Sequence, residues 1–295
     1  MRSFADCGDV VRELEQAGYI ADRSLAISLM LMSQLGRPLL VEGEAGVGKT
    51  EISKALSQIY GCELIRLQCY EGLDVNTAVY EWNYQRQLLA IKMQETEHTP
   101  LAEKERQVFS ETYLLKRPLL QAISRPRSPV LLIDEVDRAD EEFEAFLLEV
   151  LSDYQISIPE LGTITASSIP HVVLTSNGTR ELSDALRRRC LYYHLDYPSY
   201  DKELRIVVRR VPGIEARLAG QIVAFVQKLR ALDLQKRPGT AETLDWAAAL
   251  VNLNITSLDT NPEFIADTLV CLLKTGEDQC ALPPTEVARL LAQSV

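Results

Sequence analysis

The sequence predicts an α/β fold in which a parallel sheet is flanked by helices and followed by a smaller all-helical domain. Three observations carry this prediction. First, an apolar stretch is followed by a glycine-rich loop and a predicted helix over 39–59. Second, another apolar stretch, which begins at residue 130, ends in two acidic residues. Third, the sequence pattern after residue 198 predicts only helices. Short apolar runs of this kind are typical of parallel strands buried on both faces. We therefore expect two domains, 1–198 and 199–295.

The composition is that of a globular protein with an acidic surface. The chain has 295 residues, of which 46% are hydrophobic and 25% charged, and its formal net charge is −11. Proteins that wrap nucleic acid are usually basic, so this charge disfavours general nucleic-acid binding. No apolar run approaches the ~20 residues of a membrane span, and no signal peptide is expected. The six cysteines form no C-x-x-C pair, which favours reduced thiols and a cytoplasmic location.

The strongest motif is a complete G-x-x-x-x-G-K-[ST] phosphate loop. It consists of Gly43, Glu44, Ala45, Gly46, Val47, Gly48, Lys49 and Thr50. A predicted strand at 39–41 precedes it and a predicted helix at 51–59 follows, which is the context that this motif requires. Its glycines allow backbone N–H groups to converge on phosphate oxygens at a helix N-terminus. We expect Lys49 to reach the β- and γ-phosphates of ATP and Thr50 to bind Mg²⁺. The alternative is a glycine turn that happens to precede a lysine.

Two amphipathic helices are expected ahead of this loop, at 10–17 and 22–35. The second ends before Pro38, because the residue before a proline disfavours the helical conformation. The residues between the two helices, 19–21, could line a pocket for adenine. Packing in the core is the alternative role for Ile20.

A second strand is predicted at 63–68, where apolar and polar residues alternate. A long excursion follows, with helices expected at 85–94 and 109–124, the latter broken or restarted at Pro118. The aromatic residues at its start, Tyr80, Trp82 and Tyr84, indicate either an exposed partner surface or the apolar side of a hairpin.

The buried strand at 130–134 supplies the second chemical motif, since it ends in Asp134 and Glu135. Ligands of open α/β sheets bind at the carboxyl ends of the strands. We expect Asp134 to hold Mg²⁺ and Glu135 to polarise the attacking water. The alternative is a strand followed by an acid-rich helix N-terminus. The complete phosphate loop upstream favours the catalytic interpretation.

The elements that follow complete the predicted sheet. A helix is expected at 142–151, and a hairpin is expected from 154–158 and 162–165. A further buried strand, 171–176, leads to Asn177. This side chain could orient the lytic water beside the second carboxylate, or it could simply be a turn residue before a glycine.

Three consecutive arginines, Arg187, Arg188 and Arg189, lie between a short helix at 182–186 and a last strand at 192–198. Such a run is usually a solvated basic spot. Here one of the three could stabilise transition-state charge in a neighbouring subunit. The helices expected beyond them are 202–211, 214–231, 240–252, 262–273 and 284–292.

This ordered set of motifs resembles the AAA+ ATPases. Segments around the acidic strand are similar to the MoxR branch of that superfamily, namely 117–120, 132–140 and 143–149. Other segments resemble the CoxD-type accessory ATPases encoded with aerobic carbon monoxide dehydrogenases and related molybdenum hydroxylases, namely 42–51, 70–74, 158–164 and 188–192.

The resemblance implies roles for the residues already singled out. The loop would bind ATP, Asp134 the Mg²⁺, and Glu135 the water, while Asn177 would be the first sensor. It adds that Arg189 acts in trans as an arginine finger, with Arg188 as the alternative. The chain departs from many relatives in one respect, because the stretch 237–243 has no arginine at the start of the predicted lid helix.

The resemblance also implies partners and a function. An arginine supplied in trans requires a ring, expected to be a hexamer, and the family works with a protein carrying a von Willebrand factor A domain. The implied function is an ATP-driven chaperone that remodels an apo-metalloenzyme while its active-site metal is completed. Two alternatives remain open: a nucleic-acid-processing AAA+ ATPase, which the net charge disfavours, and a nucleotide-binding scaffold with little hydrolysis.

Overall fold

The computed structural model describes residues 6–93, 100–259 and 261–294. The chain forms two compact units, each assembled from separate stretches of sequence. The first unit comprises 1–10, 23–42 and 53–193, and the second comprises 11–22, 43–52 and 194–295. The predicted boundary at residue 198 stays a prediction.

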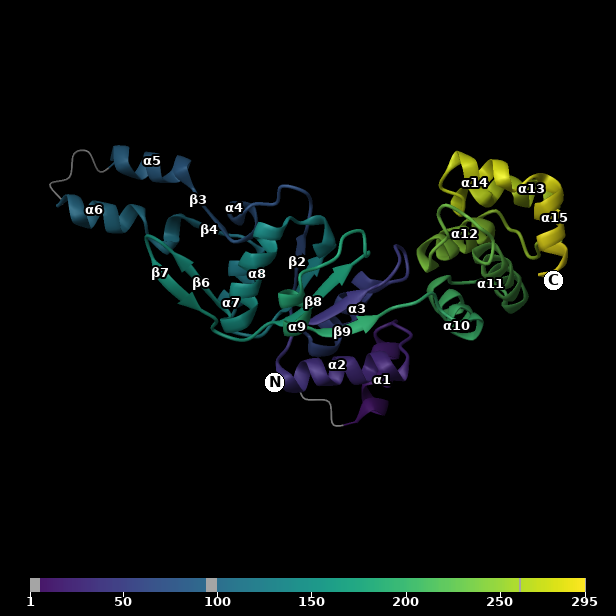
Figure 1. Ribbon diagram of the computed structural model, residues 1–295, viewed down its shortest axis with the longest axis horizontal. Helices are drawn as coiled ribbons and strands as arrows, with labels where there is room; N and C mark the ends of the chain where they lie inside the picture. The colour runs from purple at the N-terminus through teal and green to yellow at the C-terminus, as the bar shows by residue number, and fades with distance from the viewer. Residues whose placement is uncertain (1–5, 94–99, 260, 295) are drawn as a thin grey trace. The chain divides into compact units, whose positions relative to one another are not determined.

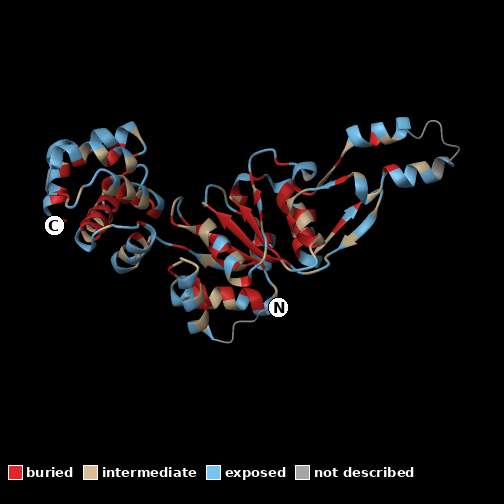
Figure 2. Cartoon of the chain, turned by 180° about the vertical axis from the view of Figure 1, so that it is seen from behind, coloured by how far each residue is buried: buried red, intermediate tan, exposed pale blue. Residues whose placement is uncertain are grey.

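A five-stranded sheet forms the centre of the first unit, in the order β2-β5-β8-β1-β9 (Figure 1). The pairs β2 with β5, β5 with β8 and β8 with β1 are parallel. All residues of β5 and β8 are buried, which explains why these strands are continuously apolar rather than alternating (Figure 2). The predicted α/β fold and its strands are confirmed. The strands are β1 (Leu39–Glu42), β2 (Leu64–Gln68), β5 (Val130–Asp134), β8 (His171–Ser176) and β9 (Leu191–His194).

The register of this sheet brings several polar strand ends to one edge. Gln68 at the end of β2 pairs with Asp134 at the end of β5, and Glu42 at the end of β1 pairs with Ser176 at the end of β8. The chain runs from Glu42 directly into the phosphate loop. Strand β1 therefore ends at the same edge of the sheet as Asp134.

Helices cover the sheet and follow its strands. Helix α2 contacts β1, and α7 contacts both β2 and β5. Apolar residues of α7 join one core cluster with β5, β8 and α8. The helices on this part of the chain are α1 (Cys7–Gln16), α2 (Arg23–Leu35), α3 (Lys49–Tyr60), α7 (Pro118–Ser124), the 3₁₀ turn η2 (Val136–Arg138), α8 (Glu141–Asp153) and α9 (Asp184–Arg189).

The excursion after β2 differs from the prediction. The stretch 109–117, expected as helix, contains a 3₁₀ turn and strand β4, because β4 pairs antiparallel with β3 and the N–H of Arg117 donates to the carbonyl of Val79. Trp82 is buried on the hairpin formed by β3 and β4, which agrees with the second interpretation. Tyr84 is 63% exposed, and a partner surface there stays a prediction. The predicted helix at 85–94 is present up to Met93, and residue 94 lies outside the described residues. The elements are α4 (Val75–Ala78), β3 (Tyr80–Trp82), α5 (Tyr84–Met93), α6 (Leu101–Val108), η1 (Glu111–Tyr113) and β4 (Leu114–Lys116).

The predicted hairpin after α8 is confirmed, with β6 (Gln155–Ile158) paired antiparallel to β7 (Gly162–Thr165). Tyr154 before it adopts the left-handed conformation that ends α8, with φ 48° and ψ 47°.

The C-terminal part of the second unit is all helical, as predicted. Its core is built around Trp246 and Phe225, whose ring centroids lie 5.3 Å apart. The sequence analysis missed α14, and the stretch expected at 262–273 divides into two pieces. The helices are α10 (Tyr200–Arg210), α11 (Ala216–Arg230), α12 (Thr240–Asn252), α13 (Pro262–Thr268), the 3₁₀ turn η3 (Leu269–Cys271), α14 (Gly276–Ala281) and α15 (Pro284–Ala292). Across the described residues, no helix has the length and apolar character needed to span a membrane.

Candidate active site

Asp134 and Glu135 mark the point where the chain leaves the sheet. Glu135 adopts the left-handed conformation, with φ 56° and ψ 49°, and turns the chain from β5 into η2. Thr175 on the neighbouring strand β8 holds both residues. Its hydroxyl Oγ1 donates to Asp134 Oδ1 at 2.6 Å and accepts from the backbone N–H of Glu135 at 2.9 Å. A strained backbone fixed by a buried neighbour is a frequent feature of functional sites.

Two residues of β2, which the sequence analysis did not single out, contact the same carboxylates. Arg66 donates to Asp134 Oδ2 through Nε at 3.0 Å and Nη2 at 2.5 Å. Gln68 donates through Nε2 to Glu135 Oε2 at 2.9 Å. The only sequence signal was their spacing, since residues two apart share one face of a strand. The Asp134 carboxylate is thus held from both neighbouring strands, by Arg66 of β2 on one oxygen and by Thr175 of β8 on the other.

Asn177 lies beside the second carboxylate, where its Nδ2 donates to Glu135 Oε1 at 3.4 Å. The buried side chain of Asp137 fixes the turn that carries it. Asp137 accepts from the N–H of Asn177 at 3.2 Å and from the N–H and hydroxyl of Thr179 at 3.0 and 2.6 Å. Burial acts to raise the pKa of Asp137, but these hydrogen bonds outweigh it, and the net pKa is lowered. Asp137 is therefore ionised at neutral pH and orders the predicted sensor.

Cys69 lies near these carboxylates, but its thiol is not reactive. Burial, supported by the negative charges of Asp134, Asp137 and Glu135, raises the pKa of the Cys69 thiol to about 12. A thiol with this pKa stays protonated and unreactive at neutral pH. All six cysteines are free thiols.

The phosphate loop belongs to the second unit. Lys49 is buried, and its Nζ donates to the carbonyls of Gly43 and Glu44, each at 2.7 Å. Gly46 and Gly48 have φ values of 77° and 99°, which only glycine adopts without strain. Because a Cβ on Gly48 would meet no atom within 4 Å, this part of the loop is open to a ligand. The loop thus has the conformation that its motif predicts.

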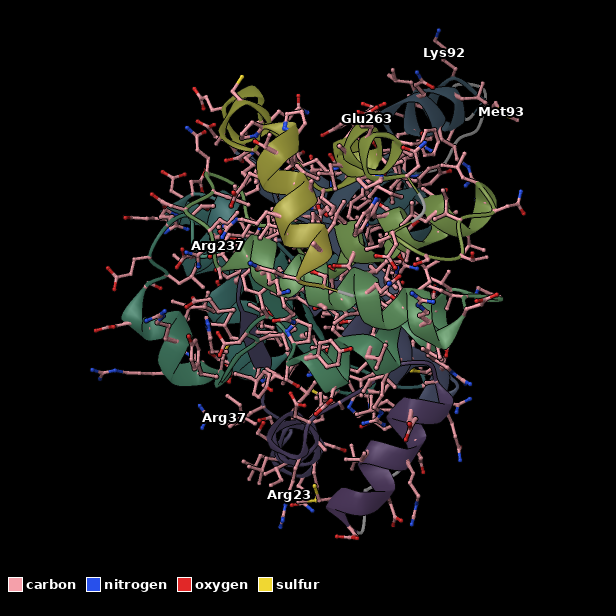
Figure 3. The ribbon with its side chains drawn as sticks, turned by 90° about the vertical axis from the view of Figure 1, so that its right-hand side faces the viewer. Arg23, Arg37, Lys92, Met93, Arg237 and Glu263 are labelled. Carbon is pink, nitrogen blue, oxygen red and sulfur yellow. The ribbon has the colours of Figure 1, made fainter. Side chains whose placement is uncertain are left out.

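The N-terminus of helix α12 lies directly on the phosphate loop. The N–H of Ala241 donates to the carbonyl of Gly46 at 3.0 Å. A Cβ on Gly239 would lie only 2.8 Å from both the carbonyl oxygen of Ala45 and the Cα of Gly46. Arg237, the only arginine of the turn before this helix, is exposed (Figure 3). This contact between helix and loop is therefore made by backbone atoms and not by an arginine side chain.

Gly239→Ala is expected to weaken ATP binding by about five- to 150-fold, which corresponds to the ~1–3 kcal/mol typical of overpacking. Gly239 has φ −78° and ψ 179°, a conformation that alanine adopts freely, so the loss would come from the contact with the loop. Titration with a fluorescent ATP analogue measures the effect. Gly276→Ala is the matched control, because a Cβ there meets nothing within 4 Å. Equal affinity of Gly239→Ala and wild type would contradict this role.

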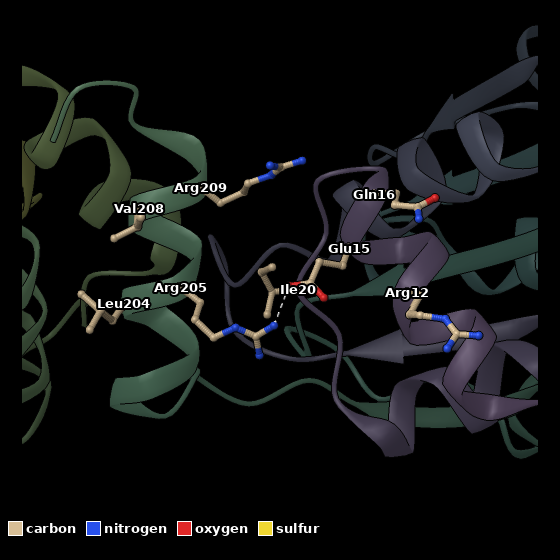
Figure 4. Close-up of a pocket in the computed structure, with 8 residues that line it drawn as sticks. All are labelled: Arg12, Glu15, Gln16, Ile20, Leu204, Arg205, Val208 and Arg209. Carbon is tan, nitrogen blue, oxygen red and sulfur yellow. Dashed lines mark hydrogen bonds and ion pairs between the residues drawn. The ribbon is translucent and has the colours of Figure 1, made fainter. Parts of the chain in front are cut away.

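Ile20 lines a cavity of about 830 Å³ within the second unit, between α1 and α10 (Figure 4). Leu204 and Val208 contribute apolar side chains from α10, and Arg205 Nη2 forms an ion pair with Glu15 Oε1 at 2.7 Å. Ile20 is also largely buried. It therefore contributes both to packing and to a cavity wall, and an adenine pocket here stays a prediction.

The three arginines differ in their surroundings. Arg187 pairs through Nη2 with Glu42 Oε2 at 3.2 Å, and its guanidinium lies 5.7 Å from the ring centroid of Tyr192. Arg188 and Arg189 are exposed. Within the described parts of the chain, their guanidinium groups have no hydrogen-bond partner. These two side chains are the ones available to a neighbouring molecule.

Comparisons with known proteins assign a family to this part of the chain. A family model described as AAA domain (dynein-related subfamily) matches residues 38–190. An uncharacterized protein of Staphylococcus aureus (strain bovine RF122 / ET3-1) is 26% identical over 209 residues, 68% of this chain and 71% of that protein. An uncharacterized protein of Staphylococcus epidermidis (strain ATCC 35984) is 25% identical over 73% of this chain and 76% of its own length. The Thermotoga maritima RuvB Holliday junction branch migration motor aligns with a TM-score of 0.45 and 16% identity, covering 88% of this chain and 68% of that one.

Proposed function

Because this chain belongs to the dynein-related subfamily of AAA domains and is an ATPase, we propose that it uses ATP hydrolysis to remodel a client protein. The client that we propose is an apo-metalloenzyme, a molybdenum hydroxylase of the carbon monoxide dehydrogenase type, whose active-site metal is being completed. The hydrogen-bonded group of Glu135, Gln68 and Asn177 at the sheet edge carries the catalytic part of this proposal. The client rests on the MoxR- and CoxD-type resemblance, and the net charge of −11 supports a protein over a nucleic acid.

The residues present fit a bound Mg²⁺. The hydroxyl of Thr50 and the carboxylate of Asp134 are the hard oxygen ligands that this ion prefers, and it typically binds through one or two such groups plus phosphate oxygens. The buried carboxylate of Asp134 is fixed by hydrogen bonds from Thr175 and Arg66, which supports the proposal because carboxylates that bind metals are typically oriented by such neighbours. When bound, Mg²⁺ would neutralise charge on the phosphate oxygens.

We assign the remaining chemistry to side chains of this chain. Lys49 and the N–H groups of the loop would hold the β- and γ-phosphates. Glu135 would accept a proton from a water that Asn177 orients, and that water would attack the γ-phosphorus. The bond between the γ-phosphorus and the β–γ bridging oxygen would then break, leaving ADP and inorganic phosphate.

The assembly that we propose is a ring, expected to be a hexamer, in which Arg189 reaches the γ-phosphate of the neighbouring subunit. Arg188 is the alternative. The exposure of both side chains supports this role, and AAA+ proteins commonly form oligomeric rings. A protein carrying a von Willebrand factor A domain is the partner expected to connect ATP turnover to the client, and the free cysteines suit a cytoplasmic setting.

Steady-state ATP hydrolysis across a range of protein concentrations tests this proposal. Specific activity is expected to rise with concentration as the composite site forms. Arg189→Ala is expected to bind ATP like the wild type and to lose that rise. Addition of a metal-free molybdenum hydroxylase should stimulate turnover more than the metal-complete enzyme does. Turnover that is independent of concentration and unchanged in Arg189→Ala would reject the ring.

A further inference from the structure

Arg37 holds the C-terminal end of the helix that carries the three arginines. Its Nε donates to the carbonyl of Arg189 at 3.1 Å, and its Nη2 donates to the carbonyl of Arg188 at 2.5 Å. A backbone bond continues the contact, since the N–H of Leu191 donates to the carbonyl of Pro38 at 2.8 Å. The turn between α2 and β1 is therefore joined to the end of α9 by two hydrogen bonds and to the first residue of β9 by a third.

Helix α9 depends on such external contacts. It has only six residues, and a helix of this length has little stability of its own. Its last carbonyls have no partner within the helix and carry partial negative charge. The forked guanidinium of Arg37 supplies both the missing donors and the opposite charge, in a geometry that a single ammonium cannot reproduce.

Positive side chains are concentrated at this end of α9. Arg187, Arg188 and Arg189 already place three positive charges in sequence, and Arg37 brings a fourth guanidinium against the same helix end. Like charges at short range repel each other. The two carbonyl contacts of Arg37 are made to the two residues whose side chains are exposed.

We propose that Arg37 is a positioning residue for the arginine that acts on the neighbouring subunit. Arg37 fixes the backbone of Arg188 and Arg189, while the pair of Arg187 with Glu42 holds the third side chain back. The side chains of Arg188 and Arg189 are thereby directed to the outside in a defined orientation. This proposal rests on the proposed function, because it requires a site shared between subunits.

Arg37→Gln is expected to lower ATP turnover by about ten- to 100-fold, the cost of misplacing a reacting group by roughly an ångström. ATP affinity is expected to stay unchanged, because Arg37 lies in the turn before β1 and touches the end of α9. Arg37→Lys keeps the charge but loses the fork, so it should show an intermediate defect. Arg23→Gln, at the other end of α2, is the matched control and should behave like the wild type (Figure 3).

Mixed assemblies give the decisive measurement. A Glu135→Gln subunit lacks the hydrolytic carboxylate but keeps its outward arginines, and an Arg37→Gln subunit has the reverse defect. Co-assembled from co-expressed chains, the two should hydrolyse ATP several-fold faster than the sum of the separate variants, since each Arg37→Gln site can receive an intact arginine from its neighbour. A role confined to the subunit's own site gives no such gain.

The reference mixture is Arg189→Ala with Glu135→Gln. If this mixture gains activity and the Arg37→Gln mixture does not, Arg37 does not act through the arginines and the proposal is overturned. If neither mixture gains activity, the trans-acting arginine of the proposed function is itself wrong. If thermal unfolding shows that Arg37→Gln is not folded, Arg37→Lys takes its place, with a smaller expected gain that corresponds to its intermediate defect.

Discussion

Glu135→Gln is expected to lower ATP turnover by about 10²–10⁴-fold, the typical contribution of a general base, while ATP still binds. Glutamine has the size and shape of glutamate, so the left-handed turn and the N–H contact to Thr175 should persist. What is lost is the carboxylate that would take the proton of the attacking water. The measurements are steady-state phosphate release and titration with a fluorescent ATP analogue.

Glu142→Gln is the matched control for this prediction, since it makes the same chemical change on the exposed first turn of α8. Turnover of the control should equal that of the wild type. If Glu135→Gln hydrolyses ATP as fast as Glu142→Gln, then Glu135 is not the base. The wild type would then have to be a scaffold with little hydrolysis, or another carboxylate would have to do this work.

The sheet and the phosphate loop could be predicted because their signals are local. A parallel strand buried on both faces typically contains a continuous apolar run, and 130–133 and 172–174 are such runs. The loop needs glycine at Gly46 and Gly48, where φ is positive. The prediction for 109–117 was wrong because the conformation there is set by pairing with β3, a partner distant in the sequence. Tertiary pairing there overrides the local preference for helix.

The contacts around the carboxylates of Asp134 and Glu135 could not be predicted from the sequence. Arg66, Gln68 and Thr175 meet Asp134 and Glu135 only because β2, β5 and β8 are neighbours in a fixed register. Sequence spacing shows that two strand residues share a face, but it does not show which strand lies beside which.

The role of Gly239 was also not predicted from the sequence. In the sequence, the stretch 237–243 stood out only because it lacks an arginine at the start of the predicted helix. In the structure, the backbone before α12 lies so close to the phosphate loop that Gly239 has no room for a side chain. A close backbone contact of this kind leaves only a weak trace in the sequence.

Glu203→Leu is expected to lower the free energy of unfolding of the C-terminal helices by about 3–5 kcal/mol, the usual cost of leaving one buried charge without its partner. Glu203 is fully buried, and its two carboxylate oxygens accept from Arg230 Nη1 and Nη2, each at 2.6 Å. Thr243 and Gln227 also donate to this carboxylate, at 2.9 and 2.8 Å. Replacing the carboxylate of Glu203 with an apolar side chain leaves the buried guanidinium of Arg230 without an opposite charge.

Urea unfolding followed by Trp246 fluorescence, in a Trp82→Phe background, reports on these helices because Trp246 lies in their core. Glu286→Leu, which removes one partner of the exposed Glu286–Arg289 pair, is the control and should leave the transition unchanged. The double variant Glu203→Leu/Arg230→Met should recover most of the stability, because replacing both partners with apolar side chains is often neutral. Failure of the double variant to recover would show that the network stabilises the unit through more than charge pairing.

The double variant Glu203→Leu/Arg230→Met also tests whether the buried ion pair contributes to ATP binding separately from its contribution to stability. Arg230 Nε donates to the carbonyl of Pro238 at 2.7 Å, and its guanidinium lies 4.9 Å from the ring centroid of Tyr197. The Arg230 side chain therefore holds the turn that presents Gly239 to the loop. Methionine cannot make this hydrogen bond, so the double variant should fold stably and yet bind ATP more weakly than the wild type. Recovery of both stability and ATP affinity would mean that the turn is held by the backbone alone, and the buried ion pair would then have no part in nucleotide binding.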